Sequence, residues 1–356
     1  MAKLMKGNVA AAEAAIRAGV EFFAGYPITP STETLETLAR RMPEEGRVFI
    51  QAEDELASIN MILGAAACGA RALATSSGPG MALKQEGFSY AARNDIPFVC
   101  MNVQRWGTGL GMLDSGQVDY LRDTRAGGNG DYRLIVYAPN SIQELVDDMY
   151  EAFDVSQKYR MGVLIESEGF LGQMMEPVEL PPYKQPPKPD WGLDGTGEVG
   201  LRQLCPCYTT KIAHDLLPVK HEKLRQISRE MQRAETVSVE DADYVFVAFG
   251  LPSRVCLDAV AKLRARGVRA GLIRPQLIWP FPEDTFRFVN PEVKAFLSVE
   301  SNDYGQMIQD VALSVKKAFP ARNIPAYCYT AGAGVPRVRQ VLDFWQRVVN
   351  GEEEGY

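Results

Sequence analysis

The sequence is poor in several features that would place it in a familiar functional class. It has no run of about 18 apolar residues, so no membrane-spanning helix is expected. The net charge is −7 and the Lys and Arg residues are scattered, whereas nucleic-acid binding needs a concentrated basic face. The two histidines, His214 and His221, argue against a catalytic triad or a metal site built on histidine.

The six cysteines are too dispersed for an iron–sulfur or zinc site. Four of them stand alone, most in apolar contexts where free cysteine behaves as a small hydrophobe. Cys205 and Cys207 form a close pair, but their spacing is typical of neither kind of site. We interpret this pair as structural or incidental, with a redox or metal role as the alternative.

The N-terminus lacks the uninterrupted apolar centre of a signal peptide, because Glu13 and Arg17 interrupt its alanine-rich stretch. A helix over residues 9–18 is predicted there instead. We expect a cytoplasmic protein.

The length of 356 residues and the alternation of pattern predict two domains. Residues 1–180 alternate strands with helices, which indicates a doubly wound, mostly parallel α/β sheet covered on both faces. Residues 181–240 are rich in proline at first and predict an extended linker, with a charged helix near 221–233. Residues 241–356 form a second α/β domain. The predicted strands are residues 20–24, 48–50, 72–76, 97–103, 134–137, 162–165, 244–249, 268–273, 296–299 and 326–329. Helices are predicted over residues 55–67 and 79–93. Ser141 is predicted to cap a helix that continues to about residue 157.

Four polar or Gly/Pro-rich clusters each follow a predicted strand of the first domain. They are YPITPST at residues 26–32, EDE at 53–55, SSGPG at 76–80 and QRWG at 104–107. Ligands of open parallel sheets bind outside the carboxyl ends of the strands. The four clusters therefore predict a single site at one edge of the sheet.

Individual residues in these clusters suggest roles. Pro27 and Pro30 fix the backbone around Thr29, so its hydroxyl is expected to contact a ligand, while Ser31 or Thr32 caps the next helix. Glu55 either belongs to a group of carboxylates that complements the helix dipole or faces the site, and the residues alone leave both open.

Arg105 ends an apolar strand, where a guanidinium suits bidentate binding of a carboxylate; a structural salt bridge is the alternative. Residues 76–80 could cradle a phosphate but lack the lysine of a P-loop. Residues 107–111 place the third glycine too early for a dinucleotide fingerprint, so a nicotinamide site is not favoured.

Taken together, YPITPS at 26–31, QAEDELAS at 51–58, TSSGPG at 75–80 and Arg105 resemble the α subunit of 2-oxoacid:ferredoxin oxidoreductases. The branched-chain (2-oxoisovalerate) and 2-oxoglutarate members are the most similar. LIRPQLIWPFP at 272–282 resembles the transketolase-C-like domain of that family. The resemblance implies a pyrimidine-type thiamine-diphosphate-binding domain over residues 1–180 and a transketolase-C-like domain over 241–356.

The family oxidatively decarboxylates a 2-oxoacid to an acyl-CoA and CO2 and passes the electrons to ferredoxin, with thiamine diphosphate as cofactor and CoA as co-substrate. The resemblance implies that Glu55 bonds the aminopyrimidine ring and that Thr29 and Arg105 bind the substrate. It also implies a cofactor-binding set that comprises Tyr26, Pro27, Ile28, Ser77 and Gly78 besides Glu55.

Two signatures of the complete enzyme are missing from this chain: the Gly-Asp-Gly stretch followed by Asn, and the cysteine spacing of ferredoxins. The resemblance therefore implies a β subunit that holds the diphosphate, Mg2+ and a [4Fe-4S] cluster. Further partners would be a γ subunit, a ferredoxin-like δ subunit and ferredoxin. A noncatalytic scaffold subunit, or a thiamine-dependent decarboxylase that does not use ferredoxin, are the competing hypotheses.

Two residues depart from the family pattern. Trp106 stands where a small residue is usual, and Asn129 stands where a histidine is common. Both are expected to reshape the substrate pocket, so the substrate stays open between branched-chain, 2-oxoglutarate and aromatic 2-oxoacids.

Overall fold

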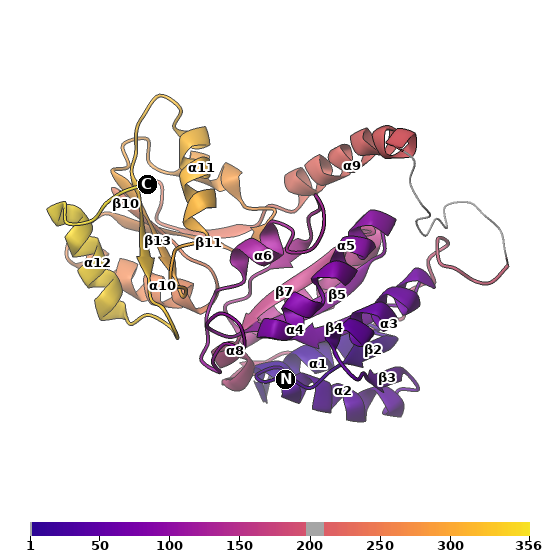
Figure 1. The fold of residues 1–356 in the computed structure, drawn as a ribbon. Coiled ribbons are helices and arrows are strands. Elements are labelled where there is room, and N and C mark those ends of the chain that lie inside the picture. Colours follow the sequence, from indigo (N-terminus) through magenta and orange to yellow (C-terminus); the bar gives the residue numbers. More distant parts are fainter. Residues whose placement is uncertain (1, 197–209) are drawn as a thin grey trace.

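Two sheets, each covered by helices, make up most of the molecule (Figure 1). The computed structural model describes residues 2–196 and 210–356, with side chains from residue 214 in the second range. Cys205 and Cys207 therefore lie outside the described residues. A two-stranded sheet of β1 (Lys3–Lys6) and β8 (Met175–Val178) completes the described sheets.

The larger sheet has seven strands in the order β12-β6-β7-β5-β4-β2-β3. All neighbours pair in parallel except β12, which is antiparallel to β6. The six strands predicted for residues 1–180 are all present, with ends shifted by up to three residues. The strands are β2 (Phe22–Gly25), β3 (Val48–Gln51), β4 (Ala72–Ser76), β5 (Phe98–Gln104), β6 (Ile135–Tyr137), β7 (Gly162–Glu168) and β12 (Leu277–Trp279).

Helices cover both faces of this sheet. On one face, the alanine-rich α1 (Gly7–Arg17) contacts α2 (Thr32–Glu44) and α7 (Ile142–Tyr159), because its small side chains allow close packing. On the other face, α3 (Glu55–Ala67) contacts α4 (Gly78–Leu83) and α5 (Gln85–Asn94). The single helix expected from residue 79 to 93 is thus two helices. Short helices α6 (Tyr120–Thr124) and α8 (Gly169–Gln173) follow β5 and β7.

Of two helix caps predicted from the sequence, one is confirmed by the structure and the other is not. Ser141 caps α7 as predicted, since its hydroxyl accepts from the Glu144 amide at 3.2 Å. Ser31 stands at the N-cap of α2, but its hydroxyl turns back to donate to the Ile28 carbonyl at 2.8 Å. The predicted side-chain cap of α2 is therefore wrong, because a local turn uses the hydroxyl first.

The second sheet has the order β14-β13-β10-β11-β9, with β9 antiparallel and the others parallel. All four predicted strands of this region are present, and β14 lies at the edge. The strands are β9 (Ala234–Val237), β10 (Tyr244–Val247), β11 (Ala270–Pro275), β13 (Ala295–Glu300) and β14 (Ala326–Thr330); the helices are α10 (Gly250–Ala265), η1 (Glu283–Phe288), α11 (Ile308–Ala318) and α12 (Val338–Asn350).

The extended conformation expected between residue 181 and the charged helix is wrong from residue 210 onward. Helix α9 (Thr210–Glu230) begins eleven residues before the expected start, and it includes Pro218. Packing explains the difference: Ile227 is buried, and Lys220 donates to two carbonyl groups at the end of α5. Residues 181–196 do lie on the surface of the first domain, where the Lys184 amide donates to the Arg17 carbonyl at 2.7 Å.

The two domains are joined by buried polar contacts. Tyr120 donates to Asp310 at 2.6 Å, and the Leu251 amide donates to Glu168 Oε1 at 2.8 Å. One hydrophobic core includes residues of both sheets. The division of the chain into a first domain at 1–180, a linker at 181–240 and a second domain at 241–356 remains a prediction. None of the helices in the described ranges has the length and hydropathy needed to cross a membrane.

Candidate active site

The carboxyl ends of the parallel strands bring the predicted clusters to one edge of the larger sheet. The chain passes from β2 outward to β3 and then returns past β2 to β4, so the direction of winding reverses at β2. Such a reversal is where open α/β sheets bind ligands. Residues 26–31 follow β2, residues 53–55 follow β3, residues 77–80 follow β4 and Arg105 follows β5.

Glu55 is the first residue of α3, and its side chain points back over the end of β4. Asp54 caps the helix by accepting from the Ala57 amide at 2.7 Å. A Cβ atom at Gly80 would collide with Glu55 Oε1 and Ser76 Oγ, so the absent side chain of this glycine leaves room for both groups. Glu55 is only 6% exposed, yet no other side chain or amide in the described ranges hydrogen-bonds its carboxylate. The position of the Glu55 side chain therefore depends on its neighbours Ser76 and Gly80, because Asp54 supplies the helix cap.

The end of β4 supplies two buried hydroxyl groups. Ser76 and Ser77 are fully buried, and neither hydroxyl has a hydrogen-bond partner within the described part of the chain. Because buried polar groups are normally satisfied, the unpaired hydroxyl of Ser76 beside Glu55 is a candidate contact for a polar ligand. Gly78 follows with a φ of 46°, and a Cβ atom there would lie 2.7 Å from Arg105 Nε.

Arg105 lies next to this group and braces two loops. Its Nη1 donates to the Thr29 carbonyl at 2.8 Å and its Nη2 to the Leu110 carbonyl at 2.5 Å. Its Nε is buried and unpaired among the residues that the structure describes. Burial lowers the pKa of Arg105, against the opposing charges of Asp119 and Glu55. Among the described residues, the guanidinium of Arg105 is held by two backbone carbonyl groups and not by a salt bridge.

The remaining predicted residues follow β2. Thr29 is exposed and meets Arg105 through its carbonyl group, and its peptide bond to Pro30 is cis. Tyr26 is exposed, while Pro27 and Ile28 are half-buried. Close contacts thus connect Thr29, Gly78 and Arg105 on one side and Glu55, Ser76 and Gly80 on the other. Tyr26, Pro27 and Ile28 join the site by their place in the chain alone.

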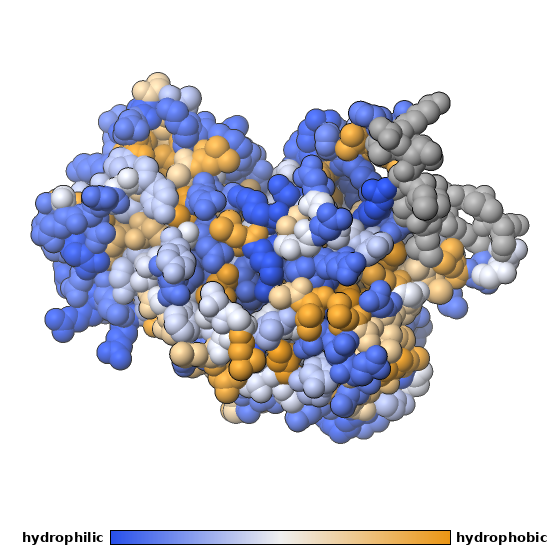
Figure 2. Space-filling view, viewed as in Figure 1, coloured by the Kyte–Doolittle hydropathy of each residue, from blue (hydrophilic) through white to orange (hydrophobic). Residues whose placement is uncertain are grey.

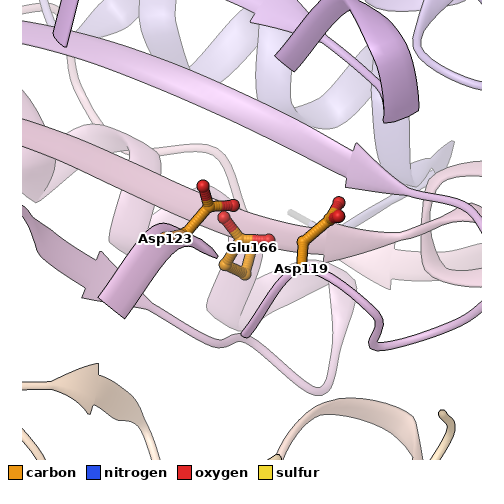
Figure 3. A group of neighbouring side chains, drawn as sticks. All are labelled: Asp119, Asp123 and Glu166. Carbon is orange, nitrogen blue, oxygen red and sulfur yellow. The ribbon is translucent and has the colours of Figure 1, made fainter. Parts of the chain in front are cut away.

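Three buried acidic residues lie close together, as Figure 3 shows: Asp119, Asp123 and Glu166. Arg122 pairs with Asp119 at 2.9 Å and with Asp123 at 2.7 Å. Asn102 donates to all three carboxyl groups. Burial, with the charge of Asp123, raises the pKa of Glu166 well above its ordinary value. Arg122 and the raised pKa of Glu166 therefore reduce the negative charge of this group from within the protein.

Sequence reasoning assigned no role to two buried polar residues near the site, although one of them, Gln104, belongs to the predicted QRWG cluster. Lys84 is fully buried between α4 and α5, and both side-chain amide atoms of Gln104 are unpaired in the described structure. A signal for Lys84 existed, because it falls on the apolar stripe of Met81, Phe88 and Ala91 at helical spacing. Gln104 carried no such signal, since it ends a strand like any polar residue.

The two residues that depart from the family pattern lie in different places. Trp106 Nε1 donates to Asp303 of the second domain at 3.3 Å, directly beside Arg105. Asn129 accepts from Ser89 through its carbonyl group and lines a cavity of about 500 Å3. Asp95 and Arg133, which line the same cavity, precede β5 and β6, so it opens toward the opposite edge of the sheet from Glu55.

Two protein-family models match the chain. Residues 13–198 match the thiamine-diphosphate-binding domain of pyruvate flavodoxin/ferredoxin oxidoreductases. Residues 242–341 match core domain II of pyruvate:ferredoxin oxidoreductase. The first match contains every predicted site residue.

Curated relatives are similar over most of their length. The ketoisovalerate oxidoreductase subunit VorB of Methanothermobacter marburgensis is 41% identical over 320 residues, which cover 88% of this chain and 89% of the relative. The 2-oxoglutarate synthase subunit KorA of Methanocaldococcus jannaschii is 34% identical over 349 residues, covering 89% and 92%.

Solved structures agree on the fold. The 2-oxoglutarate:ferredoxin oxidoreductase from Magnetococcus marinus, determined with 2-oxoglutarate, coenzyme A and succinyl-CoA bound, superposes with a TM-score of 0.83 at 24% identity, covering 97% of this chain and 65% of that one. A split-gene transketolase in an inactive beta4 tetramer gives 0.59 at 14% identity, covering 97% and 99%. The predicted α/β, thiamine-type fold is confirmed, and the chain belongs to the 2-oxoacid:ferredoxin oxidoreductase family as a subunit of these enzymes.

Proposed function

We propose that this chain is the catalytic α subunit of a 2-oxoacid:ferredoxin oxidoreductase that converts a 2-oxoacid to an acyl-CoA and CO2. The observation that carries the proposal is the position of Glu55. Its buried carboxylate lies beside the unpaired hydroxyl group of Ser76 at the point where the winding of the sheet reverses. A carboxylate left without protein partners at such a point is available to a ligand.

The residues at this edge fit the ring of thiamine diphosphate. Glu55 offers a carboxylate to a ring nitrogen, and Ser76 and Ser77 offer hydroxyl groups that lack partners in the described chain. Gly78 and Gly80 keep the space between them free of side chains. When bound, thiamine diphosphate supplies the carbanion chemistry that cleaves the bond next to the 2-oxo group. Tyr26, Pro27 and Ile28 would line the same ring from the end of β2.

The chain's own contribution is to position groups and to exchange a proton. Glu55 would hold a proton between its carboxylate and the ring nitrogen. Arg105 has an unpaired Nε and is already oriented by two carbonyl groups, so it would bind the substrate carboxylate. The hydroxyl of Thr29, exposed beside it, would contact the substrate carbonyl. Burial of Arg105 strengthens a charged hydrogen bond there.

The rest of the site would come from a β subunit that holds the diphosphate, Mg2+ and a [4Fe-4S] cluster. Large hydrophobic side chains are exposed around the site and support a partner surface: Leu56, Leu83, Leu110, Met112, Leu113 and Phe170. Figure 2 shows hydrophobic residues gathered on the face where α3 and α4 lie in Figure 1. The γ subunit, a ferredoxin-like δ subunit and ferredoxin would complete the assembly.

For the substrate we propose a branched-chain 2-oxoacid of the ketoisovalerate type. The support is the greater identity to the VorB relative, at 41%, than to the KorA relative, at 34%. Trp106 narrows the space beside Arg105, which also favours a compact apolar side chain over a second carboxylate. 2-Oxoglutarate and an aromatic 2-oxoacid are the comparison substrates, to be measured by 2-oxoacid-dependent reduction of a viologen dye.

Glu55→Gln in the purified complex tests the catalytic role. We expect 2-oxoacid-dependent reduction of a viologen dye to fall by at least about 100-fold, since a positioned proton-transfer group contributes 10²–10⁴-fold. The complex should assemble as before, because no protein group in the described chain depends on this carboxylate. Glu53→Gln, an exposed neighbour, is the matched control. Full turnover in Glu55→Gln would make the chain a noncatalytic scaffold.

A further inference from the structure

Lys84 is a buried cation that the proposed chemistry does not use. It lies where α4 ends and α5 begins, and its side chain is fully buried. Its Nζ donates to Ser58 Oγ at 2.8 Å and approaches the carbonyl oxygen of Glu55 at 3.4 Å. Over residues 2–196 and 214–356, no carboxylate forms an ion pair with it. The partners of this ammonium are therefore neutral oxygens on the first turn of α3.

These contacts continue to the strand that carries Thr29. Ser58 Oγ donates in turn to the carbonyl oxygen of Ala24, near the end of β2, at 2.8 Å. The path from Lys84 through Ser58 to Ala24 links the α4–α5 junction, α3 and β2. Helix α3, which begins with Glu55, and strand β2, which precedes Thr29, are thus linked to Lys84 by these hydrogen bonds.

Burial of this lysine is costly. Burying an ammonium group without a paired carboxylate costs free energy. Burial lowers the pKa of Lys84, and Coulomb interactions with Cys100, Glu55 and Asp54 oppose this shift. The hydrogen bonds to Ser58 and to the Glu55 carbonyl group are the contacts that hold the side chain in this position.

We propose that Lys84 is a positioning residue for Glu55. It fixes the first turn of α3 through its hydrogen bonds to the Glu55 carbonyl group and to Ser58. This inference rests on the proposed role of Glu55. The hydrogen bonds set where the Glu55 carboxylate lies at the site.

Two variants test the hydrogen bonds of Lys84. Lys84→Met removes them, whereas Lys84→Gln keeps a donor. In the complex with its partner subunits, we expect Lys84→Met to weaken thiamine diphosphate binding about tenfold in a direct titration, and Lys84→Gln to restore part of that affinity. The exposed Lys262, changed to Met, is the control and should leave the affinity unchanged.

The outcomes separate this inference from the proposed function. If Glu55→Gln keeps full turnover, the proposed function fails whatever Lys84 does. If Glu55→Gln is inactive but Lys84→Met keeps the wild-type cofactor affinity, the role of Lys84 alone is overturned. A lower melting temperature with an unchanged cofactor affinity would likewise reduce Lys84 to a structural residue. Should Lys84→Met fail to assemble, Ser58→Ala removes the same hydrogen bond, and an unchanged affinity in that variant rejects the inference.

Discussion

Glu55 and Glu300 are both buried carboxylates at the carboxyl edge of a parallel sheet, one in each domain, yet their surroundings differ. Glu300 accepts from the amides of Gln306, Met307 and Ile308 at 2.7–2.9 Å and from three further side chains. Glu55 has no such partner among the described residues, although it is nearly as buried. The same residue type therefore serves to start α11 in one domain and is left available in the other.

Glu168 stands between these extremes. It ends β7 at the same edge as Glu55, and it accepts from the Leu251 amide at 2.8 Å and from Gln117 at 3.2 Å. Burial raises the pKa of its carboxyl group to about 7, whereas hydrogen bonds to Leu251 and Gln117 oppose the shift. In the order Glu300, Glu168 and Glu55, the number of hydrogen-bond partners within the protein falls, and the structural role of the carboxylate falls with it. Full satisfaction marks a structural group, and its absence marks a candidate ligand contact.

Removing Glu300 should produce the largest loss of stability. Glu300→Ala leaves three amides at the start of α11 without an acceptor, and each unsatisfied buried group costs about 1–3 kcal/mol. We expect the free energy of unfolding, measured by urea denaturation, to fall by about 3 kcal/mol or more. Glu55→Ala should change it far less. Equal losses for the two variants would contradict the contrast drawn between the domains.

Glu168 predicts a pH effect on stability. Because its pKa is raised from 4.5 to about 7, the folded state binds its proton more tightly than the unfolded state does. Its contribution to stability is complete below about pH 4.5 and is lost as pH rises through about 7, by about 3 kcal/mol in all. Glu168→Gln should remove this loss, so the variant gains stability relative to wild type between about pH 5 and pH 8. Parallel pH dependences in urea denaturation would show that Glu168 does not titrate in this range.

Arg105 offers the smallest and most specific test. Arg105→Ala should raise the Michaelis constant for the 2-oxoacid by roughly 10- to 100-fold, since a hydrogen bond to a charged group is worth about 1.5–3 kcal/mol. Arg254→Ala, which breaks a partly exposed ion pair with Glu176, is the control. Steady-state kinetics with saturating thiamine diphosphate and CoA would measure both. An unchanged Michaelis constant would assign Arg105 to bracing the carbonyls of Thr29 and Leu110 alone.

Much of the fold could be predicted from local patterns of apolar residues in the sequence. The limits of β4 and α3 follow from short apolar runs and helical periodicity, and both match the structure to the residue. The clusters after the strands identified one edge of the sheet, because parallel topology alone brings strand ends together. The start of helix α9 could not be placed from its sequence, since it contains Pro218 and packing on α5 outweighs the effect of this proline.

The polar interior of the site was harder to foresee. The unpaired state of Ser76 and Gln104 depends on distances between elements remote in the sequence, which no local pattern records. The same holds for Lys84, whose partners lie 26 and 29 residues away. Sequence can indicate which residues approach a site, whereas the number of partners each one finds there is a property of the folded chain.

Strand β12 has a consequence for the integrity of the protein. Residues Leu277–Trp279 belong to the second half of the chain, yet they form the outermost strand of the first sheet by pairing with β6. A fragment that ended before them would leave the backbone of β6 open along one side, and open strand edges recruit other chains. The first half is thus protected against self-association by a strand that is synthesised last among the seven.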